Sequence, residues 1–494
     1  MFKRVTTVLL LSASSAWAAP PAAGTTTAAA PTAPAAAKAA APAASPAPAA
    51  SPAPANAAPR DPAAVALERL ALSIQRVTLD NGLRVVLNKD SSSPTVAVSV
   101  TYDVGSRSEG PGQSGFAHLF EHMMFQGSQN VKKGQHFGLI TERGGTLNGT
   151  TSSDRTNYFE SLPSSELELA LFLEADRMRW LAVTAENFEN QRAVVKEEYR
   201  MRVDNAPFGR AHLRLGELTF ADYFPYAHPT IGSMQDLDAA KLEWVADFYK
   251  SHYAPNNAVL AIAGDFDTDQ ALELVRKYFG PAEKRQVPPF VSPTTPKDSG
   301  TLARREVVED KNTNTPGILW GYRIPPARSP DHYALELAAL LLSDGESSRL
   351  YQKLVRDRAI LQQVAAWTDD RRGPDMFGLM GVLTEKAKLE EVERAFEAEL
   401  DRLRKTPPSA AELARVKARL KHDFVFALQS NGTRSTRLGE YEVFFGDARI
   451  LARELGFYLA VTPEDVKRVS NEYLRSDSRF AIEVRPARAP GAKP

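Results

Sequence analysis

Hydrophobic and polar positions alternate with a period of two where the first structured stretch begins. Residues 74–79 and 83–87 flank Asp80-Asn81-Gly82, a turn sequence, so this segment predicts a β-hairpin. Residues 95–102 (TVAVSVTY) alternate in the manner of a half-buried strand. Residues 258–263 (AVLAIA) are apolar throughout, which predicts a buried strand.

Helical periodicity marks residues 237–253, which we expect to form one helix before that buried strand. The same order of amphipathic helix, Tyr, short loop and strand returns at an offset of 220 residues. Two unrelated helix–strand units could produce so few matches. The matched pairs are Ala246 and Val466, Tyr249 and Val469, Tyr253 and Tyr473, Ala261 and Ala481, and Ile262 and Ile482. Together with the chain length they favour an α+β fold of two similar domains, each a mainly antiparallel β-sheet packed with helices.

The first 68 residues have a different composition from the rest. Residues 1–18 combine Lys3 and Arg4, a short apolar run and an A-x-A-like end, which is typical of a signal peptide cleaved after Ala18. An uncleaved anchor is the alternative, although the apolar run is shorter than the about 20 residues of a membrane span. Residues 19–68 are rich in Ala and Pro, so we expect a disordered linker. With no cysteine in the chain, a bacterial periplasm is the compartment that fits.

The remaining chain is longer than one hydrophobic core usually serves. We expect an N-terminal metal-binding domain over residues 69–286, a linker over 287–300 that holds four prolines, and a C-terminal domain without a metal site over 301–494. Lys and Arg total 60, as do Asp and Glu, so the charge balance gives no sign of a nucleic-acid partner. No later stretch is long and apolar enough to form a transmembrane segment.

Residues 118–122 read H-L-F-E-H and carry the clearest chemical signal. On a helix, His118 and His122 project from one face, where two neutral imidazoles can hold one Zn²⁺. Glu121 then lies close enough to act on a water molecule at the metal. This is the H-x-x-E-H order of a class of zinc peptidases. The plainer alternative is a helix with two solvated or hydrogen-bonded histidines.

A catalytic zinc ion usually has three protein ligands. The helix-forming segment 187–204 holds Glu197 and Glu198 side by side. Glu198 shares a helix face with Gln191 and Val195, a stripe that we expect to be buried, whereas Glu197 points about 100° away. We therefore predict Glu198 as the third ligand. The alternative is that both glutamates are surface charges.

The chain resembles the inverzincin metallopeptidases related to pitrilysin, insulin-degrading enzyme and mitochondrial processing peptidase. It is most similar to the short bacterial processing-peptidase-like members, in their zinc-bearing subunit. The resemblance covers most of the chain from about residue 70. It rests on the H-x-x-E-H motif together with the blocks 115–117 (GFA), 148–152 (NGTTS), 194–198 (VVKEE) and 253–258 (YAPNNA).

The resemblance implies that His118, His122 and Glu198 bind one zinc ion per chain and that Glu121 is the general base. It also implies that the Asn148 block is an edge strand that binds an extended peptide substrate by strand addition, with Asn148 and Gly149 as substrate-binding residues. A plain turn at Asn148-Gly149 is the alternative.

Two positions depart from the family pattern. Gln191 stands where the family usually has a second glutamate, and it can hydrogen-bond a group at the metal but cannot carry charge. Active members that work with one type of chain usually hold an Arg and a Tyr seven residues apart in the second domain, where this chain has Val355 and Gln362. A one-residue slip would place Arg356 and Gln363 there and still leave no tyrosine.

This absence predicts a divided site. We expect a heterodimer in which a related subunit without the metal motif supplies the Arg and the Tyr, and a homodimer is the alternative. The predicted activity is that of a zinc endopeptidase acting on peptides or unfolded segments. The competing function is a non-catalytic structural subunit, as in respiratory complexes, but such a scaffold has no need of the complete metal set.

Overall fold

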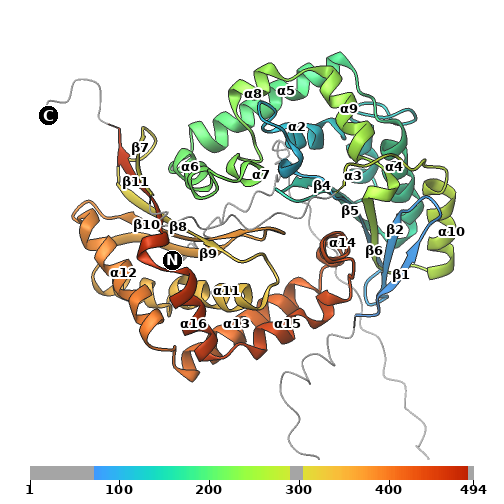
Figure 1. Ribbon diagram of the computed structural model, residues 1–494. Helices are drawn as coiled ribbons and strands as arrows, with labels where there is room; N and C mark the ends of the chain where they lie inside the picture. The colour runs from blue at the N-terminus through green and yellow to red at the C-terminus, as the bar shows by residue number, and fades with distance from the viewer. Residues whose placement is uncertain (1–71, 290–303, 488–494) are drawn as a thin grey trace, which may run out of the picture.

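Two β-sheets with helices packed against them form the computed structural model, which describes residues 72–289 and 304–487 (Figure 1). The first sheet has six strands in the order β1-β2-β6-β3-β5-β4, and the second has five in the order β7-β11-β8-β10-β9. The first-sheet strands are β1 (Gln75–Thr78), β2 (Arg84–Lys89), β3 (Thr95–Tyr102), β4 (Thr146–Thr151), β5 (Thr156–Pro163) and β6 (Ala258–Gly264). The second-sheet strands are β7 (Arg304–Asp310), β8 (Gly317–Ile324), β9 (Leu361–Thr368), β10 (Asp375–Leu383) and β11 (Phe480–Pro486).

The helices divide between the two halves of the chain. Those of the first half are α2 (Phe116–Met123), α3 (Gln135–Thr141), α4 (Leu167–Trp180), α5 (Ala185–Tyr199), α6 (Gly209–Thr219), α7 (Phe224–Ala227), α8 (Met234–Ala239), α9 (Leu242–His252) and α10 (Thr268–Phe279). Those of the second half are α11 (Pro330–Ser343), α12 (Leu389–Lys405), α13 (Ala410–Ala427), α14 (Asn431–Phe445), α15 (Ile450–Ala460) and α16 (Pro463–Tyr473).

The two sheets repeat one topology. Without β1, the order β2-β6-β3-β5-β4 corresponds strand by strand to β7-β11-β8-β10-β9. In the first sheet β6 is parallel to β2 and antiparallel to β3. In the second sheet β11 is likewise parallel to β7 and antiparallel to β8. The predicted α+β fold of two similar, mainly antiparallel domains is therefore confirmed. The domain boundaries stay a prediction, because most of the expected linker lies outside the described residues.

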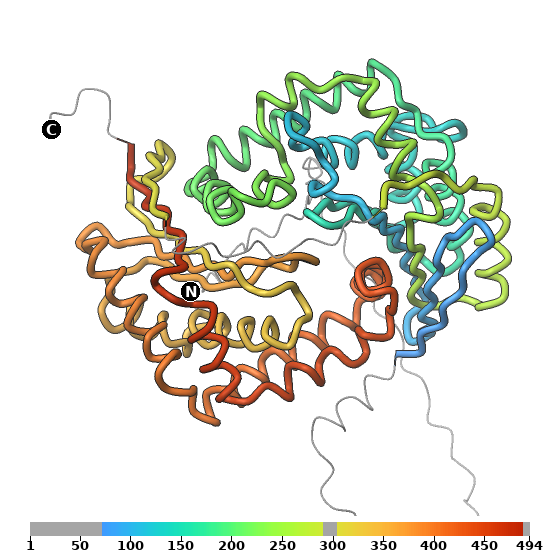
Figure 2. The backbone as a smooth tube through the Cα atoms, viewed as in Figure 1, coloured from blue at the N-terminus to red at the C-terminus, as the bar shows by residue number. Residues whose placement is uncertain are grey.

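Strand β6 is apolar throughout because both faces of its sheet are covered. Leu260 and Ile262 join the core of the first half, whereas the alternate residues Val259 and Ala261 pack in a cluster with Leu438 of α14. Helix α14 belongs to the second half but lies against the first sheet, between the two halves in Figure 2.

Helix α6 makes the reciprocal contact. Its residues Ala211 and Leu215 pack in one cluster with Leu319 of β8 and Ile482 of β11. Each half thus covers one face of the other half's sheet, which joins the two halves through shared hydrophobic contacts.

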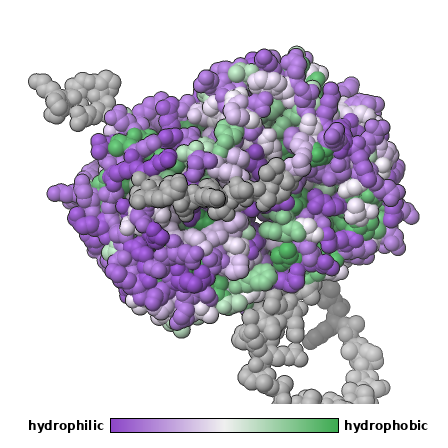
Figure 3. Space-filling view, viewed as in Figure 1, coloured by the Kyte–Doolittle hydropathy of each residue, from purple (hydrophilic) through white to green (hydrophobic). Residues whose placement is uncertain are grey.

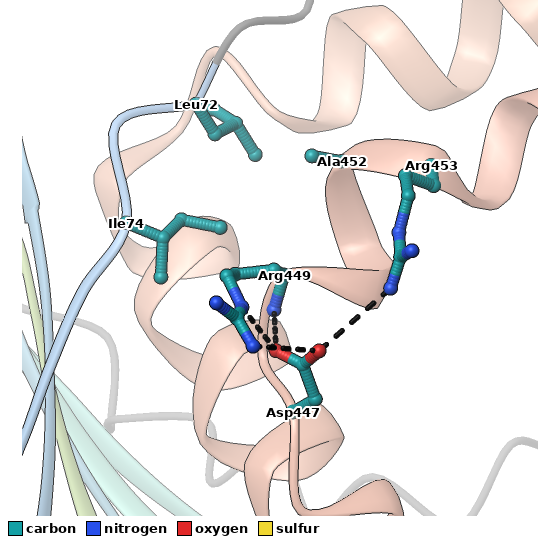
Figure 4. Close-up of a pocket in the computed structure, with 6 residues that line it drawn as sticks. All are labelled: Leu72, Ile74, Asp447, Arg449, Ala452 and Arg453. Carbon is teal, nitrogen blue, oxygen red and sulfur yellow. Dashed lines mark hydrogen bonds and ion pairs between the residues drawn. The ribbon is translucent and has the colours of Figure 1, made fainter.

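The start of the described chain is also tied to the second half. Arg76 of β1 pairs with Glu442 of α14, with Nη2 and Oε1 2.6 Å apart. Leu72 and Ile74 face the beginning of α15 across a small pocket beside Asp447 (Figure 4). These contacts bring the first strand against two helices of the second half.

The strand predictions agree closely with the structure. The hairpin forms with Gln75 opposite Leu87 and Thr78 opposite Arg84, residues 95–102 are β3, and residues 258–263 lie in β6.

The prediction of one helix over residues 237–253 is wrong. The chain leaves the helical conformation at Ala240, with φ −59° and ψ 140°, which separates α8 from α9. Arg192 of α5 donates to the carbonyl oxygens of Asp238 and Ala240, at 3.5 and 3.4 Å. This contact with a distant helix satisfies carbonyl groups at the end of α8, and no local pattern encodes it.

The visible face of the molecule is mostly hydrophilic, with smaller hydrophobic areas between (Figure 3). Among the described residues, no helix is long and apolar enough to span a membrane. The predicted signal peptide and the Ala/Pro-rich linker lie outside the described residues.

Candidate metal centre

Helix α2 carries the histidine motif and is anchored at its first residues. Glu109 accepts hydrogen bonds from the backbone N–H groups of Gly115 and Ala117, at 2.9 and 2.7 Å, and a carboxylate is favourable at a helix N-terminus. Gly115 has φ +90°, and a Cβ atom there would lie 2.7 Å from the Cα atom of Gly232. Only glycine fits this close approach, which sets the angle at which α2 enters the site.

The structure brings three potential metal ligands together. His118 and His122 lie one turn apart on α2, with ring centroids 4.9 Å apart. Glu198 reaches them from α5, and its Oε2 atom lies 3.6 Å from Nε2 of His118 and 3.3 Å from Nε2 of His122. One ligand atom from each residue lies within 4.8 Å of the other two.

These separations match the coordination of zinc. Two donor atoms bound at about 2.1 Å to a tetrahedral ion lie about 3.4 Å apart. Burial and the neighbouring charge of His122 lower the pKa of His118 to about 3, so its imidazole is neutral, as a metal ligand must be. Burial alone would raise the pKa of Glu198, but a hydrogen bond from His122 and the charges of both histidines lower it to about 2. Two imidazoles and one carboxylate are a donor set that fits Zn²⁺.

Of the two neighbouring glutamates, Glu198 and not Glu197 joins the histidines. The Glu197 side chain is 63% exposed and pairs with Arg200 at 2.8 Å. The Glu198 side chain is 13% exposed, and its second oxygen, Oε1, lies 3.0 Å from Nε of Arg202. Arg202 thus fixes the carboxylate from the side opposite the histidines.

Glu121 points from α2 towards strand β4. Its side chain is buried, and its Oε2 atom accepts a hydrogen bond of 2.6 Å from Oγ1 of Thr151. Burial raises the pKa of Glu121 to about 7, against the opposing influence of the His122 charge and the Thr151 hydrogen bond. A carboxyl group with a pKa near neutrality is suited to accept and return a proton.

Asn148 and Gly149 lie within β4, so they form the edge strand that we predicted and not a plain turn. A Cβ atom at Gly149 would come within 3.1 Å of Oε1 of Glu121 and of the Phe125 ring. Because glycine has no side chain, the Glu121 carboxylate can lie directly against the backbone of Gly149. The Asn148 Oδ1 atom accepts a hydrogen bond of 2.9 Å from the N–H group of Gly149.

Thr151 is a site residue that the sequence reasoning did not single out. It lies two positions after Gly149, so both side-chain positions share one face of β4. Because alternate strand residues share a face, placing Gly149 beside Glu121 would have predicted that Thr151 also faces Glu121.

Gln191 lies two helical turns before Glu198 and is buried. Although burial lowers the pKa of His122, hydrogen bonds to Glu198 and Gln191 and the nearby carboxylates raise it above its usual value. The Nε2 atom of Gln191 donates to Oδ1 of Asn190 at 2.8 Å. Gln191 thus contacts the ligand set through His122.

The second-half positions that lack the family's Arg and Tyr have partners in their own half. Val355 packs against the second-half core. The Gln362 amide donates to the carbonyl oxygen of Leu383 at 2.9 Å. Arg356 is exposed and pairs with the adjacent Asp357 at 3.0 Å.

Comparison with known proteins identifies the family of this chain. Residues 84–220 match the family model "Insulinase (Peptidase family M16)", and residues 240–420 match "Peptidase M16 inactive domain". The zinc protease PqqE of Helicobacter pylori is 30% identical over 417 residues, which are 83% of this chain and 93% of that protein. The "Probable mitochondrial-processing peptidase subunit beta" of Arabidopsis thaliana is 25% identical over 421 residues, covering 82% of this chain and 77% of that protein.

Solved structures share the fold. The crystal structure of a protease from Helicobacter pylori superposes with a TM-score of 0.80 at 30% identity, covering 84% of this chain and all (100%) of that one. A peptidase M16 inactive domain from Pseudomonas fluorescens, at 19% identity, has the same fold with a TM-score of 0.73 and covers 85% of this chain and 99% of that one. The chain belongs to the M16 family of metallopeptidases.

Proposed function

We propose that this chain is a zinc-dependent endopeptidase that binds one Zn²⁺ through His118, His122 and Glu198. The observation that carries this proposal is the spacing of 3.3 to 3.6 Å between the donor atoms, with Glu121 on the same helix turned towards the substrate strand. The family membership and the zinc proteases among the relatives support it.

The residues divide the chemistry among them. When bound, Zn²⁺ lowers the pKa of a coordinated water and polarises the scissile carbonyl. Glu121 accepts the proton of the attacking water and later delivers it to the leaving amine. Thr151 holds one oxygen of Glu121, which leaves the other free to take the proton.

Strand β4 supports an extended peptide as the substrate. It is the last strand of its sheet, so its outer backbone groups are available for strand addition. Asn148 and Gly149 lie on this strand beside Glu121, and main-chain recognition makes little demand on the substrate sequence.

The proposal includes a partner. Val355 has no hydrogen-bond donor in its side chain, and the Gln362 amide donates to the Leu383 carbonyl oxygen within its own half, so a related subunit that carries an Arg and a Tyr completes the site in a heterodimer. Residues 1–18 support delivery to the periplasm. Native mass measurement of the chain purified alone tests the pairing, and a fully active homo-oligomer would contradict it.

Glu121→Gln tests the chemistry in the presence of the partner. We expect peptide cleavage to fall by at least about 100-fold with zinc content unchanged, because the amide cannot take a proton. Glu197→Gln, an exposed neighbour on α5, is the matched control and should cleave as the unaltered protein does. Undiminished cleavage by Glu121→Gln would contradict the role of Glu121 as the base, whereas an unaltered, zinc-loaded protein that cleaves no peptide with its partner present would favour the scaffold alternative.

A further inference from the structure

A second group of ionisable side chains is buried in the first half. His136 comes from α3, Glu160 from β5, and Glu174 and Arg177 from α4. Their exposed fractions are 4%, 1%, 0% and 2%. One ligand atom from each of His136, Glu160 and Glu174 lies within 4.8 Å of the other two.

Arg177 has one carboxylate partner in this group, and Glu160 has none. The guanidinium of Arg177 binds both oxygens of Glu174, with Nε and Oε2 3.1 Å apart and Nη2 paired with Oε1. Within the described residues, no hydrogen-bond donor reaches either oxygen of Glu160 or pairs with Nε2 of His136. Buried polar atoms of this kind require a bound proton, ion or water.

Charge balance separates a proton from a metal ion. With Glu160 ionised and His136 neutral, Glu160, Glu174 and Arg177 leave one uncompensated negative charge in the protein interior. A divalent cation would turn it into one positive charge, whereas a proton on Glu160 makes the group neutral, the state that burial favours. Burial and the neighbouring Glu174 raise the pKa of Glu160 well above 4.5, in agreement with a bound proton.

The other side of Arg177 faces two aromatic rings. Its guanidinium carbon lies 4.4 Å from the ring centroid of Tyr158 and 5.0 Å from that of Phe125. Phe125 lies two residues after the end of α2, and its N–H group donates to the carbonyl oxygen of His122 at 3.2 Å. Tyr158 of β5 pairs with Gly149 of β4. The guanidinium therefore lies between the segment after α2 and strand β5, which pairs with the substrate strand β4 that Glu121 faces.

We propose that Arg177 is a positioning residue for the catalytic site, held in the interior by an acid pair in which Glu160 keeps its proton and donates it to Glu174. The inference rests on the proposed peptidase function. The planar guanidinium sets the spacing between the end of α2 and strand β5, and, through the pairing of β5 with β4, the placement of Glu121 against a peptide on β4.

Arg177→Lys tests the positioning role, because lysine keeps the charge but loses the planar fork and the stack. We expect kcat to fall at least tenfold, with KM within twofold and one zinc ion per chain retained. Arg179→Lys is the matched control: Arg179 lies on the same helix and stacks at 3.7 Å on the exposed ring of Trp180. It should leave kcat unchanged.

Should Arg177→Lys fail to fold, the double variant Glu174→Gln with Arg177→Met removes both charges together and avoids an unpaired buried carboxylate. The same tenfold loss of kcat is expected. Unaltered kcat in a folded, zinc-loaded variant of either kind would overturn the positioning role and leave the peptidase function standing. An unaltered protein that cleaves no peptide with its partner present would instead contradict the proposed function.

Glu160→Gln tests the acid pair without an activity assay. The raised pKa of Glu160 means that its stabilising contribution is complete below about 4.5 and is lost as the pH rises towards its folded value. Among the groups around it, burial lowers the pKa of His136 well below 6.5 and raises the pKa of Tyr102 and Tyr158 well above 10.0, so these neighbours keep one charge state between about pH 5 and pH 8. Glu174 is bound by the Arg177 guanidinium. The Tm of Glu160→Gln should therefore rise relative to the unaltered protein over this range. A constant Tm difference, or a second metal ion per chain that only the unaltered protein binds, would overturn the acid pair.

Discussion

The two His–Glu groups of the first half have the same ligand types but different neighbours. His118, His122 and Glu198 contain one carboxylate, and the His122 and Glu198 side chains are 14% and 13% exposed. The group of Glu160 and Glu174 contains two carboxylates and Arg177, all sealed from solvent. Proximity of potential ligands therefore does not by itself make a metal site: the charge already present and an open side decide what the group binds.

Glutamine replacements break this comparison most strongly. Glu198→Gln should weaken zinc binding by more than about 100-fold, because it removes the anionic ligand itself. Loss of a residue that only hydrogen-bonds a ligand costs about 10- to 100-fold. Glu160→Gln should leave zinc affinity unchanged. Competition with a zinc chelator, followed by metal analysis of both variants, measures the difference, and equal losses in the two would show that the groups are not independent.

Arg202 pairs with the Glu198 oxygen that does not face the histidines. Arg202→Met should weaken zinc binding by about tenfold, since it frees the second oxygen of Glu198. Arg200→Met is the control, because Arg200 pairs with exposed Glu197. Zinc titration of the metal-free protein checks both, and an unchanged affinity for Arg202→Met would mean that Glu198 is held by the helix alone.

Thr151→Val sharpens the description of the first group with a nearly isosteric change. Loss of a hydrogen bond to a carboxylate corresponds to about 1.5 kcal/mol, so kcat should fall about tenfold with KM and zinc content unchanged. Thr151→Ser restores the hydroxyl and should recover most of the rate. Steady-state kinetics decide, and a serine variant as slow as valine would assign the loss to packing.

The smallest effect is an opposite pH dependence of the two carboxylates in the metal-free protein. The pKa of Glu198 is lowered to about 2, so its stabilising contribution is present above about 4.5 and is lost as the pH falls towards 2. The contribution of Glu160 is lost in the other direction, as the pH rises. In thermal melts against pH, the Tm of Glu198→Gln should therefore rise relative to the unaltered protein as the pH falls below about 4.5. The Tm of Glu160→Gln should rise relative to the unaltered protein as the pH increases above about 4.5.

Much of the group of His118, His122 and Glu198 could be predicted because its signals are local. The spacing of His118 and His122 needs only one helical turn, and the apolar stripe on α5 selects Glu198 over Glu197. The strands β3 and β6 follow from periodicity in the same way. The buried group around Glu160 could not be predicted, because its members come from three elements spread over about forty residues, and no periodic pattern connects them.

Local patterns thus determined the strands, the motif helix and the choice between two adjacent glutamates. Only the tertiary structure decided that α6 and α14 each cover the other half's sheet, that Arg192 binds the carbonyl groups where α8 ends, and that Arg177 lies over the Phe125 ring. The physical reason is that backbone geometry makes every third or fourth helical residue, or every second strand residue, share a face. Contacts between distant segments depend instead on how whole elements pack, which a pattern along the chain does not record.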